Sequence, residues 1–232
     1  MKTKPILFNT AMVQAVQAGI KTVTRRLIKP QPQSDLELCE DGLCYQEIVP
    51  TGVDTYQIHK PPYLPGDIMY VRETWAKYKE LDSARTVWLY KADEPRKTIY
   101  EADGMTLSAN QKIKWNPSIH MPKEAARIFL RVTNVRAERL REITFGGVVD
   151  EGTPKPTDID WLNVDFKSES PPPFCWFARL WDGTINPADL AIYGWKANPW
   201  VWVVEFERCR AAWDPILKTF CRIAPNDNKE AV

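Results

Sequence analysis

The sequence predicts an α+β fold in which a small mixed β-barrel carries a few short helices and long loop insertions. Segments rich in β-branched and aromatic residues lie near both ends of the chain and in its middle, over 22–28, 126–135 and 200–206. The 19 prolines indicate extended segments and argue against an all-helical fold. No internal repeat or linker divides the chain, so we expect one domain over 1–224, followed by a disordered polar tail over 225–232.

The first thirty residues predict a strand, a short helix and a second strand. Residues 5–9 favour a buried strand, and Thr10 has the side chain of a helix N-cap. Apolar residues then recur at helical spacing until Gly19, which indicates a helix end. Residues 22–28 are predicted to be extended, and the prolines that follow end the strand.

Long polar stretches are expected to be insertions near 31–62, 76–114 and 153–176. The first contains a predicted hairpin around Asp41 and Gly42, and the second a hairpin between 88–90 and 98–100. Between them, residues 68–75 alternate as one strand, and Glu73 shares a face with apolar residues. A carboxylate in that position needs a cationic or hydrogen-bonding partner. A short helix is predicted over 142–152 and a helical turn over 177–181.

The most unusual local feature is a basic stretch that runs from Lys21 to Arg26. The first thirty residues hold six Lys or Arg and no Asp or Glu, in a chain whose net charge is +1. Such a concentration of positive charge attracts anions, phosphate among them. A charge cluster of this kind also commonly forms a solvated surface. A further run of arginines over 123–141 predicts a continuation of the basic surface as a phosphate track.

Cysteine usage and hydropathy suggest a cytoplasmic protein without a membrane span. No window of about 18 apolar residues occurs, and the basic N-terminus lacks the apolar segment of a signal peptide. The five cysteines are interpreted as reduced thiols. Cys39 and Cys44 have a loose metal-ligand spacing, but the two histidines lie far from them in sequence, so we expect no metal and no cofactor.

Two motifs carry a family resemblance. The residues Gly19, Lys21, Thr24 and Arg26 resemble the Gly-x-Lys-x-x-Glu-x-Arg signature of the ASCH domain family, with Thr24 in place of the Glu. Residues 65–75 and the segment 198–206 resemble later strands of the same family. The resemblance covers most of the chain and is greatest to larger members from bacteriophages and prophages. It implies a PUA-like fold and a partner that is RNA or a modified nucleoside, with an oligomeric state that the sequence leaves open.

The stretch Lys-Thr-x-Thr-x-Arg is similar to a bacterial branch of the family that removes the acetyl group from N4-acetylcytidine. The resemblance implies that Lys21, Thr24 and Glu73 are catalytic and that Arg26 holds phosphate, ribose or the Glu. Further candidates for nucleic-acid or nucleoside binding lie in the basic stretch and in two later segments: Arg25, Arg26, Trp75, Ser118 and His120. Trp75 also fits simple core packing, and Ser118 and His120 occupy a loop bounded by prolines.

Amide hydrolysis requires a nucleophile, a base and a group that stabilises the oxyanion. Thr24 offers a hydroxyl, while Lys21 acts as base only if its pKa falls well below about 10.4. Alternatively Lys21 stabilises the oxyanion and Glu73 is the base. Side chains alternate along a strand, so Lys21 and Thr24 can meet only if Lys21 lies in the turn before the strand or at a bulge.

Other functions remain open at this point. A non-catalytic RNA-binding module of phage origin requires the same basic stretch without the hydrolytic trio. A metal-independent ribonuclease is a further enzymatic alternative. A structural or morphogenetic phage protein is a third class, although the sequence has no heptad pattern to support it.

Overall fold

The computed structural model describes residues 1–50, 54–79, 86–93, 113–153, 172–209, 212–214 and 219–221. They belong to two compact units. The first unit is built from Ala18–Asp67 and Arg131–Glu207, and the second from Lys2–Gln17, Ile68–Leu130 and the residues after Glu207. Each unit therefore draws on separate parts of the chain.

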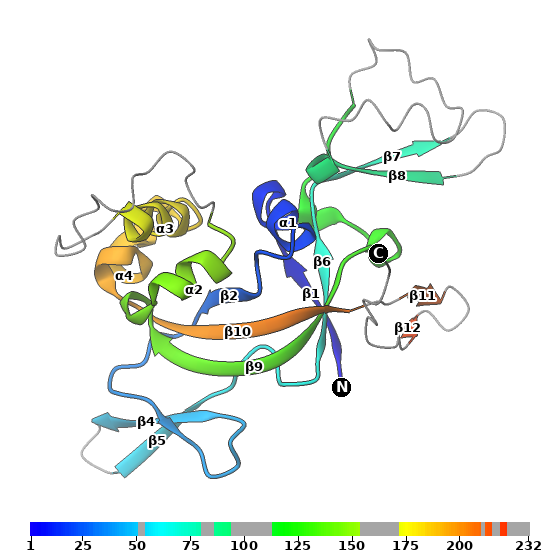
Figure 1. Cartoon of the computed structure of the whole chain (residues 1–232). Helices are drawn as coiled ribbons and strands as arrows, with labels where there is room; N and C mark the ends of the chain where they lie inside the picture. The colour runs from blue at the N-terminus through cyan, green and yellow to red at the C-terminus, as the bar shows by residue number, and fades with distance from the viewer. Residues whose placement is uncertain are drawn as a thin grey trace, which may run out of the picture. The chain divides into compact units, whose positions relative to one another are not determined.

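The first unit is built on three strands in the order β9–β10–β2 (Figure 1). These are β9 (Phe129–Arg139), β10 (Trp200–Cys209) and β2 (Val23–Leu27). Strands β10 and β2 are antiparallel, and Thr24 lies opposite Val204 while Arg26 lies opposite Trp202. The pairing places the side chains of each such pair on the same face of the sheet.

Helices cover one face of these strands. They are α2 (Phe145–Asp150), α3 (Pro172–Asp182) and α4 (Leu190–Tyr193), with 3-10 turns η4 (Leu140–Glu142), η6 (Pro187–Asp189) and η7 (Trp195–Ala197). Val23 and Val203 on the strands pack against Val148, Phe177 and Trp181 of the helices. Burial of this apolar surface holds the helices on the sheet.

A small sheet lies on the other side of the strands in the first unit. It comprises β3 (Glu37–Leu38), β4 (Tyr45–Pro50) and β5 (Asp54–His59), paired in antiparallel order. The ring of Tyr45 meets the ring of Trp202 edge-on, with centroids 5.5 Å apart. Part of the expected insertion 31–62 is thus a folded element. Gly42 has a φ of 66° between β3 and β4, which confirms the predicted hairpin.

The second unit contains the parallel pair β1 (Thr3–Leu7) and β6 (Ile68–Arg72) with the helix α1 (Thr10–Gln17). Strands β7 (Trp75–Lys79) and β8 (Thr86–Tyr90) form a hairpin, and β11 (Ala212–Asp214) pairs with β12 (Thr219–Cys221). Three 3-10 turns complete it: η1 (Lys91–Asp93), η2 (Ser118–His120) and η3 (Lys123–Ala125). Val13, Met69 and Val71 are fully buried.

The α+β class is confirmed, with mostly strands and short helices, but no sheet of the described residues closes into a barrel. Among the described strands, β2 pairs with β10 alone and lies at the end of the strand order. The three strands predicted over 22–28, 126–135 and 200–206 are confirmed as β2, β9 and β10, although the ends of each strand differ from the predicted ones. The helix predicted over 142–152 corresponds to α2, and Gly152 follows it with a φ of 81°.

Two local predictions are wrong in detail, and a third is not tested. The N-cap of α1 is Asn9, whose Oδ1 accepts from the amide of Met12 at 2.9 Å. The expected single strand 68–75 ends at Arg72, and Trp75 begins β7. Residues 88–90 pair with 75–77; their expected partners, 98–100, lie outside the described residues, as does the tail 225–232.

Candidate functional site

The turn that precedes β2 places Lys21 ahead of the strand. Gly19 has a φ of 71°, which glycine adopts without strain. The amide of Thr22 donates to the carbonyl of Asp150 at 2.8 Å, and β2 begins only at Val23. The condition set by the sequence, that Lys21 lie in the turn, is therefore met.

The ammonium group of Lys21 is completely coordinated. It donates to the carbonyl of Val23 at 2.7 Å, to the carbonyl of Glu151 at 2.8 Å and to Oε2 of Glu151 at 2.6 Å. The residue is 2% exposed. Glu151 is the C-cap of α2, so the cation lies where the last carbonyls of a helix favour positive charge. Lys21 thus clamps the turn before β2 to the end of α2.

Arg25 shares the same carboxylate. Its guanidinium lies 3.3 Å from Oε1 of Glu151 and 2.6 Å from Oε1 of Glu138. A side chain added at Gly147 would approach Nη2 of Arg25 to 3.3 Å, so only a small residue fits there. Lys21, Arg25, Glu138 and Glu151 form what we call the Glu151 cluster, with two cations and two carboxylates. The cluster is electrically balanced and buried, so these two basic residues do not form the solvated surface considered from the sequence.

Burial governs the titration of Lys21. Loss of solvent lowers the pKa of the Lys21 amine, the charge and hydrogen bond of Glu151 oppose this, and Arg26 and Arg25 lower the pKa further. A lowered pKa is what a lysine amine requires to act as a general base. The three acceptors around the ammonium, in contrast, favour the protonated form.

Thr24 and Arg26 belong to the opposite face of β2. Side chains alternate along the strand, and Val23 and Arg25 occupy the face beneath the helices. Thr24 therefore projects away from the Glu151 cluster, and Lys21 and Thr24 lie on opposite sides of β2. Thr24 is buried there, with 2% of the residue exposed. Arg26 is half-buried on the same side.

The environment of Arg26 combines burial with aromatic neighbours. Burial lowers the pKa of the Arg26 guanidinium, and Tyr63 and Glu151 act in the opposite direction. The cross-strand neighbour of Arg26 is Trp202, which is buried and packs on Tyr45. This face of β2 accordingly places a cation and a hydroxyl beside an aromatic wall.

In the second unit, Glu73 is buried against an arginine. Its Oε1 accepts from Nε of Arg127 at 2.9 Å and its Oε2 from Nη2 at 3.0 Å. Arg127 also pairs with Asp93 at 2.6 Å, and its guanidinium lies 3.8 Å from the centroid of the Tyr90 ring. The predicted cationic partner exists and is Arg127, which sequence analysis did not identify. The bidentate fork is a geometry that arginine adopts with carboxylates.

Burial raises the pKa of the Glu73 carboxyl. The hydrogen bonds and charge of Arg127 lower it, and the charge of Asp93 raises it again. Burial also raises the pKa of Tyr90 to about 12. Lys21 and Thr24 belong to the first unit and Glu73 to the second, so the convergence of these three residues stays a prediction.

Three further candidates, Trp75, Ser118 and His120, lie in the second unit. Trp75 is half-buried with its ring centroid 5.3 Å from that of Trp88, and its Nε1 has no hydrogen-bond partner in the described part of the chain. The backbones of Trp75 and Asn116 exchange two hydrogen bonds, which tie the segment before η2 to β7. Ser118 is half-buried in η2 and His120 is exposed.

Carboxylates neutralise much of the expected phosphate track. Arg131 pairs with Glu207, Arg136 with Glu138 and Glu205, and Arg127 with Glu73 and Asp93. Arg139 lies over the ring of Trp200, 4.5 Å from its centroid. The arginines of 123–141 therefore supply far less net positive charge than their number suggests.

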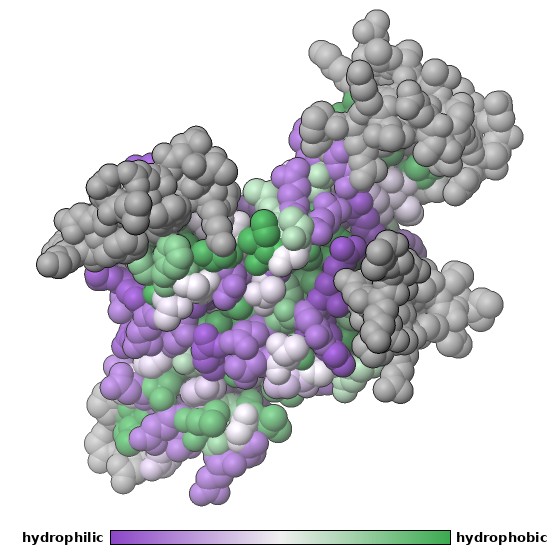
Figure 2. Space-filling model, in the orientation of Figure 1, coloured by the Kyte–Doolittle hydropathy of each residue, from purple (hydrophilic) through white to green (hydrophobic). Residues whose placement is uncertain are grey.

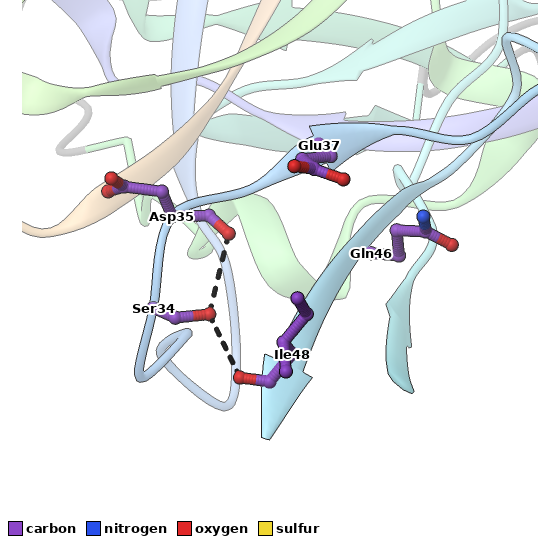
Figure 3. Close-up of a pocket in the computed structure, with 5 residues that line it drawn as sticks. All are labelled: Ser34, Asp35, Glu37, Gln46 and Ile48. Carbon is purple, nitrogen blue, oxygen red and sulfur yellow. Dashed lines mark hydrogen bonds between the residues drawn. The ribbon is translucent and has the colours of Figure 1, made fainter. Parts of the chain in front are cut away.

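A hollow of about 280 Å³ opens beside the small sheet of the first unit (Figure 3). Asp35 and Glu37 line it together with Ser34, Gln46 and Ile48. The Ser34 hydroxyl donates to the carbonyl of Ile48 at 3.2 Å. None of the candidate residues lines this hollow, and its two carboxylates disfavour phosphate. Close to it, Ile48, Tyr56 and Ile58 are exposed on β4 and β5, where Figure 2 shows apolar surface.

Cys39 and Cys44 form a disulfide, whereas Cys175 and Cys209 are not disulfide-bonded. The expectation of reduced thiols is wrong for this pair because the hairpin brings their Cα atoms to 5.4 Å, a separation that suits a disulfide. In the part of the chain that the structure describes, no helix has the length and apolar character of a membrane span. Comparisons with protein-family models, curated proteins and solved structures find no match for this chain.

Proposed function

We propose that this protein binds a modified nucleoside or a short RNA segment in the cytoplasm, as a member of the ASCH family with a PUA-like barrel. The binding surface is the face of β2 that carries Thr24 and Arg26. The observation that supports the proposal is the position of Thr24, a residue that is 2% exposed, beside the half-buried Arg26 on the face of β2 opposite Val23 and Arg25.

The chemistry of this face suits a nucleoside. A guanidinium binds phosphate or the carbonyl edge of a base in a bidentate manner, and a threonine hydroxyl both donates and accepts. Trp202 is buried against Tyr45, so it acts as a wall of the site and not as a platform on which a base stacks. The Glu151 cluster on the other face holds β2 in place and contributes no free charge.

The neutralised arginines favour a small ligand over a long RNA track. Binding to single-stranded nucleic acid weakens with salt by a slope of roughly −0.7 for each phosphate neutralised. With Arg26 as the principal cation, we expect a slope between about −0.7 and −1.4, for one or two phosphates. A long track of five arginines would give a slope of roughly −3.5.

A second candidate is the amidohydrolase of acetylated cytidine. The opposite pKa shifts of Lys21 and Glu73, both caused by burial, favour it because acid–base catalysis needs groups that titrate nearer to neutrality. In this scheme Thr24 or a water molecule attacks the acetyl carbonyl. The complete coordination of the Lys21 ammonium and its place across β2 from Thr24 favour binding without hydrolysis.

The test is a calorimetric titration of the full chain with cytidine and N4-acetylcytidine, as nucleosides and in short RNA. We expect Arg26→Met to weaken binding about tenfold to a hundredfold, as the loss of a hydrogen bond to a charged group does. Thr24→Val should weaken binding less. Arg131→Met and Thr133→Val, two changes at exposed positions on β9, are the matched controls. Wild-type affinity in both β2 variants would refute the proposed surface.

Release of acetate from acetylcytidine separates the two candidates. Hydrolysis by the wild type that is lost in Lys21→Met and Glu73→Gln would favour the amidohydrolase. Binding without acetate release would leave the non-catalytic module. The absence of both binding and release across the ligands would overturn the proposed function as a whole.

A further inference from the structure

The hairpin loop between β3 and β4 brings three metal-ligating groups together. The sulfurs of Cys39 and Cys44 and a carboxylate oxygen of Asp41 all lie within 4.8 Å of one another. Asp41 Oδ1 is 3.5 Å from the sulfur of Cys44. Two cysteine sulfurs and a carboxylate within one six-residue loop form a compact group that neither the proposed nucleoside surface nor the Glu151 cluster uses.

The backbone of the loop holds these groups in place. The amide of Cys39 donates to the carbonyl of Cys44 at 2.9 Å, and the amide of Gly42 donates to the carbonyl of Cys39 at 2.9 Å. Gly42 has a φ of 66°, which closes the turn. The amide of Leu43 donates to Oδ1 of Asp41 at 2.8 Å, and this hydrogen bond orients the carboxylate. Oriented ligands of this kind bind metal more tightly than freely rotating ones.

We propose that Cys39, Asp41 and Cys44, with the two cysteines in the dithiol form, bind a divalent cation of the Zn²⁺ class, with water in the fourth position. The donor set of two thiolates and one carboxylate suits zinc, whereas Mg²⁺ and Ca²⁺ prefer oxygen ligands alone. Two Zn–S bonds of about 2.3 Å at the tetrahedral angle require sulfurs about 3.8 Å apart. Rotation of the two side chains opens the pair to that separation on the same hairpin.

Thiol–disulfide exchange controls access to the site. Two thiols of a reductant convert the Cys39–Cys44 disulfide into two protein thiols and are themselves oxidised to a disulfide. Binding of Zn²⁺ then forms two Zn–S bonds and releases the two thiol protons to solvent. The oxidised hairpin is closed by the disulfide and the reduced hairpin by the metal, so the loop is cross-linked in both states. This site is independent of the proposed nucleoside surface.

The probe is Co²⁺ added anaerobically to the full chain after reduction and removal of the reductant, followed by displacement with Zn²⁺. We expect one Co²⁺ per chain, with thiolate-to-cobalt charge-transfer absorption that Zn²⁺ abolishes. Cys39→Ser and Cys44→Ser should each lose this absorption, and Asp41→Asn should weaken binding at least about tenfold. Glu40→Gln, a change at the neighbouring exposed carboxylate, is the matched control and should bind as the wild type does.

A variant with serine at the other three cysteines, Cys175, Cys209 and Cys221, should retain the absorption. As a second measurement, bound Zn²⁺ should protect Cys39 and Cys44 from alkylation while Cys175 and Cys209 react. No charge-transfer band from the reduced wild type would overturn the proposal and leave the pair as a disulfide only. A band that persists in Cys39→Ser or Cys44→Ser, or an unchanged affinity in Asp41→Asn, would also overturn the three-ligand site.

Discussion

Neutralising Glu151 should destabilise the protein strongly, because the change leaves two buried cations beside one remaining carboxylate. In Glu151→Gln, Lys21 loses the carboxylate that lies 2.6 Å from its amine, and Arg25 loses one of its two carboxylates and keeps Glu138. Removing one partner of a buried ion pair costs about 3–5 kcal/mol. Lys21 retains two carbonyl acceptors and can release its proton, so we expect the lower end, about 3 kcal/mol at neutral pH.

The assay is urea denaturation followed by tryptophan fluorescence, at constant ionic strength. Glu207→Gln is the matched control, since Glu207 pairs with Arg131 at a site where both side chains are about half exposed. Surface pairs of this type contribute at most about 1 kcal/mol. The double variant Lys21→Met/Glu151→Gln should recover part of the loss, and the cycle should give a coupling above about 1.5 kcal/mol. A loss in Glu151→Gln no larger than that in Glu207→Gln would refute the clamp assigned to Lys21.

Three other predictions concern buried ionisable groups. The pKa of Lys21 is lowered in the folded state, so the unfolded chain binds more protons as the pH approaches about 10.4 from below. The free energy of unfolding should therefore rise with pH in that range. Lys21→Met should flatten the rise in denaturant titrations between pH 8 and 10. Burial raises the pKa of Glu47, but hydrogen bonds from His59 and two backbone amides lower it below its usual value. Its contribution to stability should therefore be present above about pH 4.3 and be lost as acid is added, and Glu47→Gln should show a shallower acid transition by circular dichroism. Arg127→Met should lower the free energy of unfolding in urea by about 3–5 kcal/mol, because Glu73 is left buried without this partner. Arg127→Met/Glu73→Gln should recover much of that loss. A loss below about 1 kcal/mol in Arg127→Met would contradict a stabilising ion pair between Arg127 and Glu73.

Local sequence patterns predicted the elements whose signals lie within a few residues. The β-branched run over 22–28 and the segment 200–206 became strands β2 and β10, and the glycine at position 19 adopts a positive φ. Glu73 is buried as expected, although it lies after the end of β6 and not within a continuous strand over 68–75. These features depend on backbone sterics and on the two-residue alternation of side chains along a strand, and both can be recognised in a single sequence.

The partners of the charged residues could not be predicted in the same way. Lys21 lies 130 positions from Glu151, and Arg127 lies 54 positions from Glu73. Nothing in one sequence says which of the many carboxylates a given cation will meet. The positive charge that marked the basic stretch therefore belongs largely to internal pairs, and the face that carries Thr24 and Arg26 emerged only with the register of β2 against β10.

The long sequence separation between Lys21 and Glu151 has a consequence for the order of folding. Helix α2 has six residues, and an isolated helix of that length is not appreciably populated in water. Its C-terminal end is held by Lys21, and closing a loop of 130 residues costs on the order of 4 kcal/mol of chain entropy. The turn before β2 must therefore pack against the end of α2 before the helix becomes stable. We expect α2 to form late, and its amides to be among the first of the first unit to exchange when the native structure opens locally.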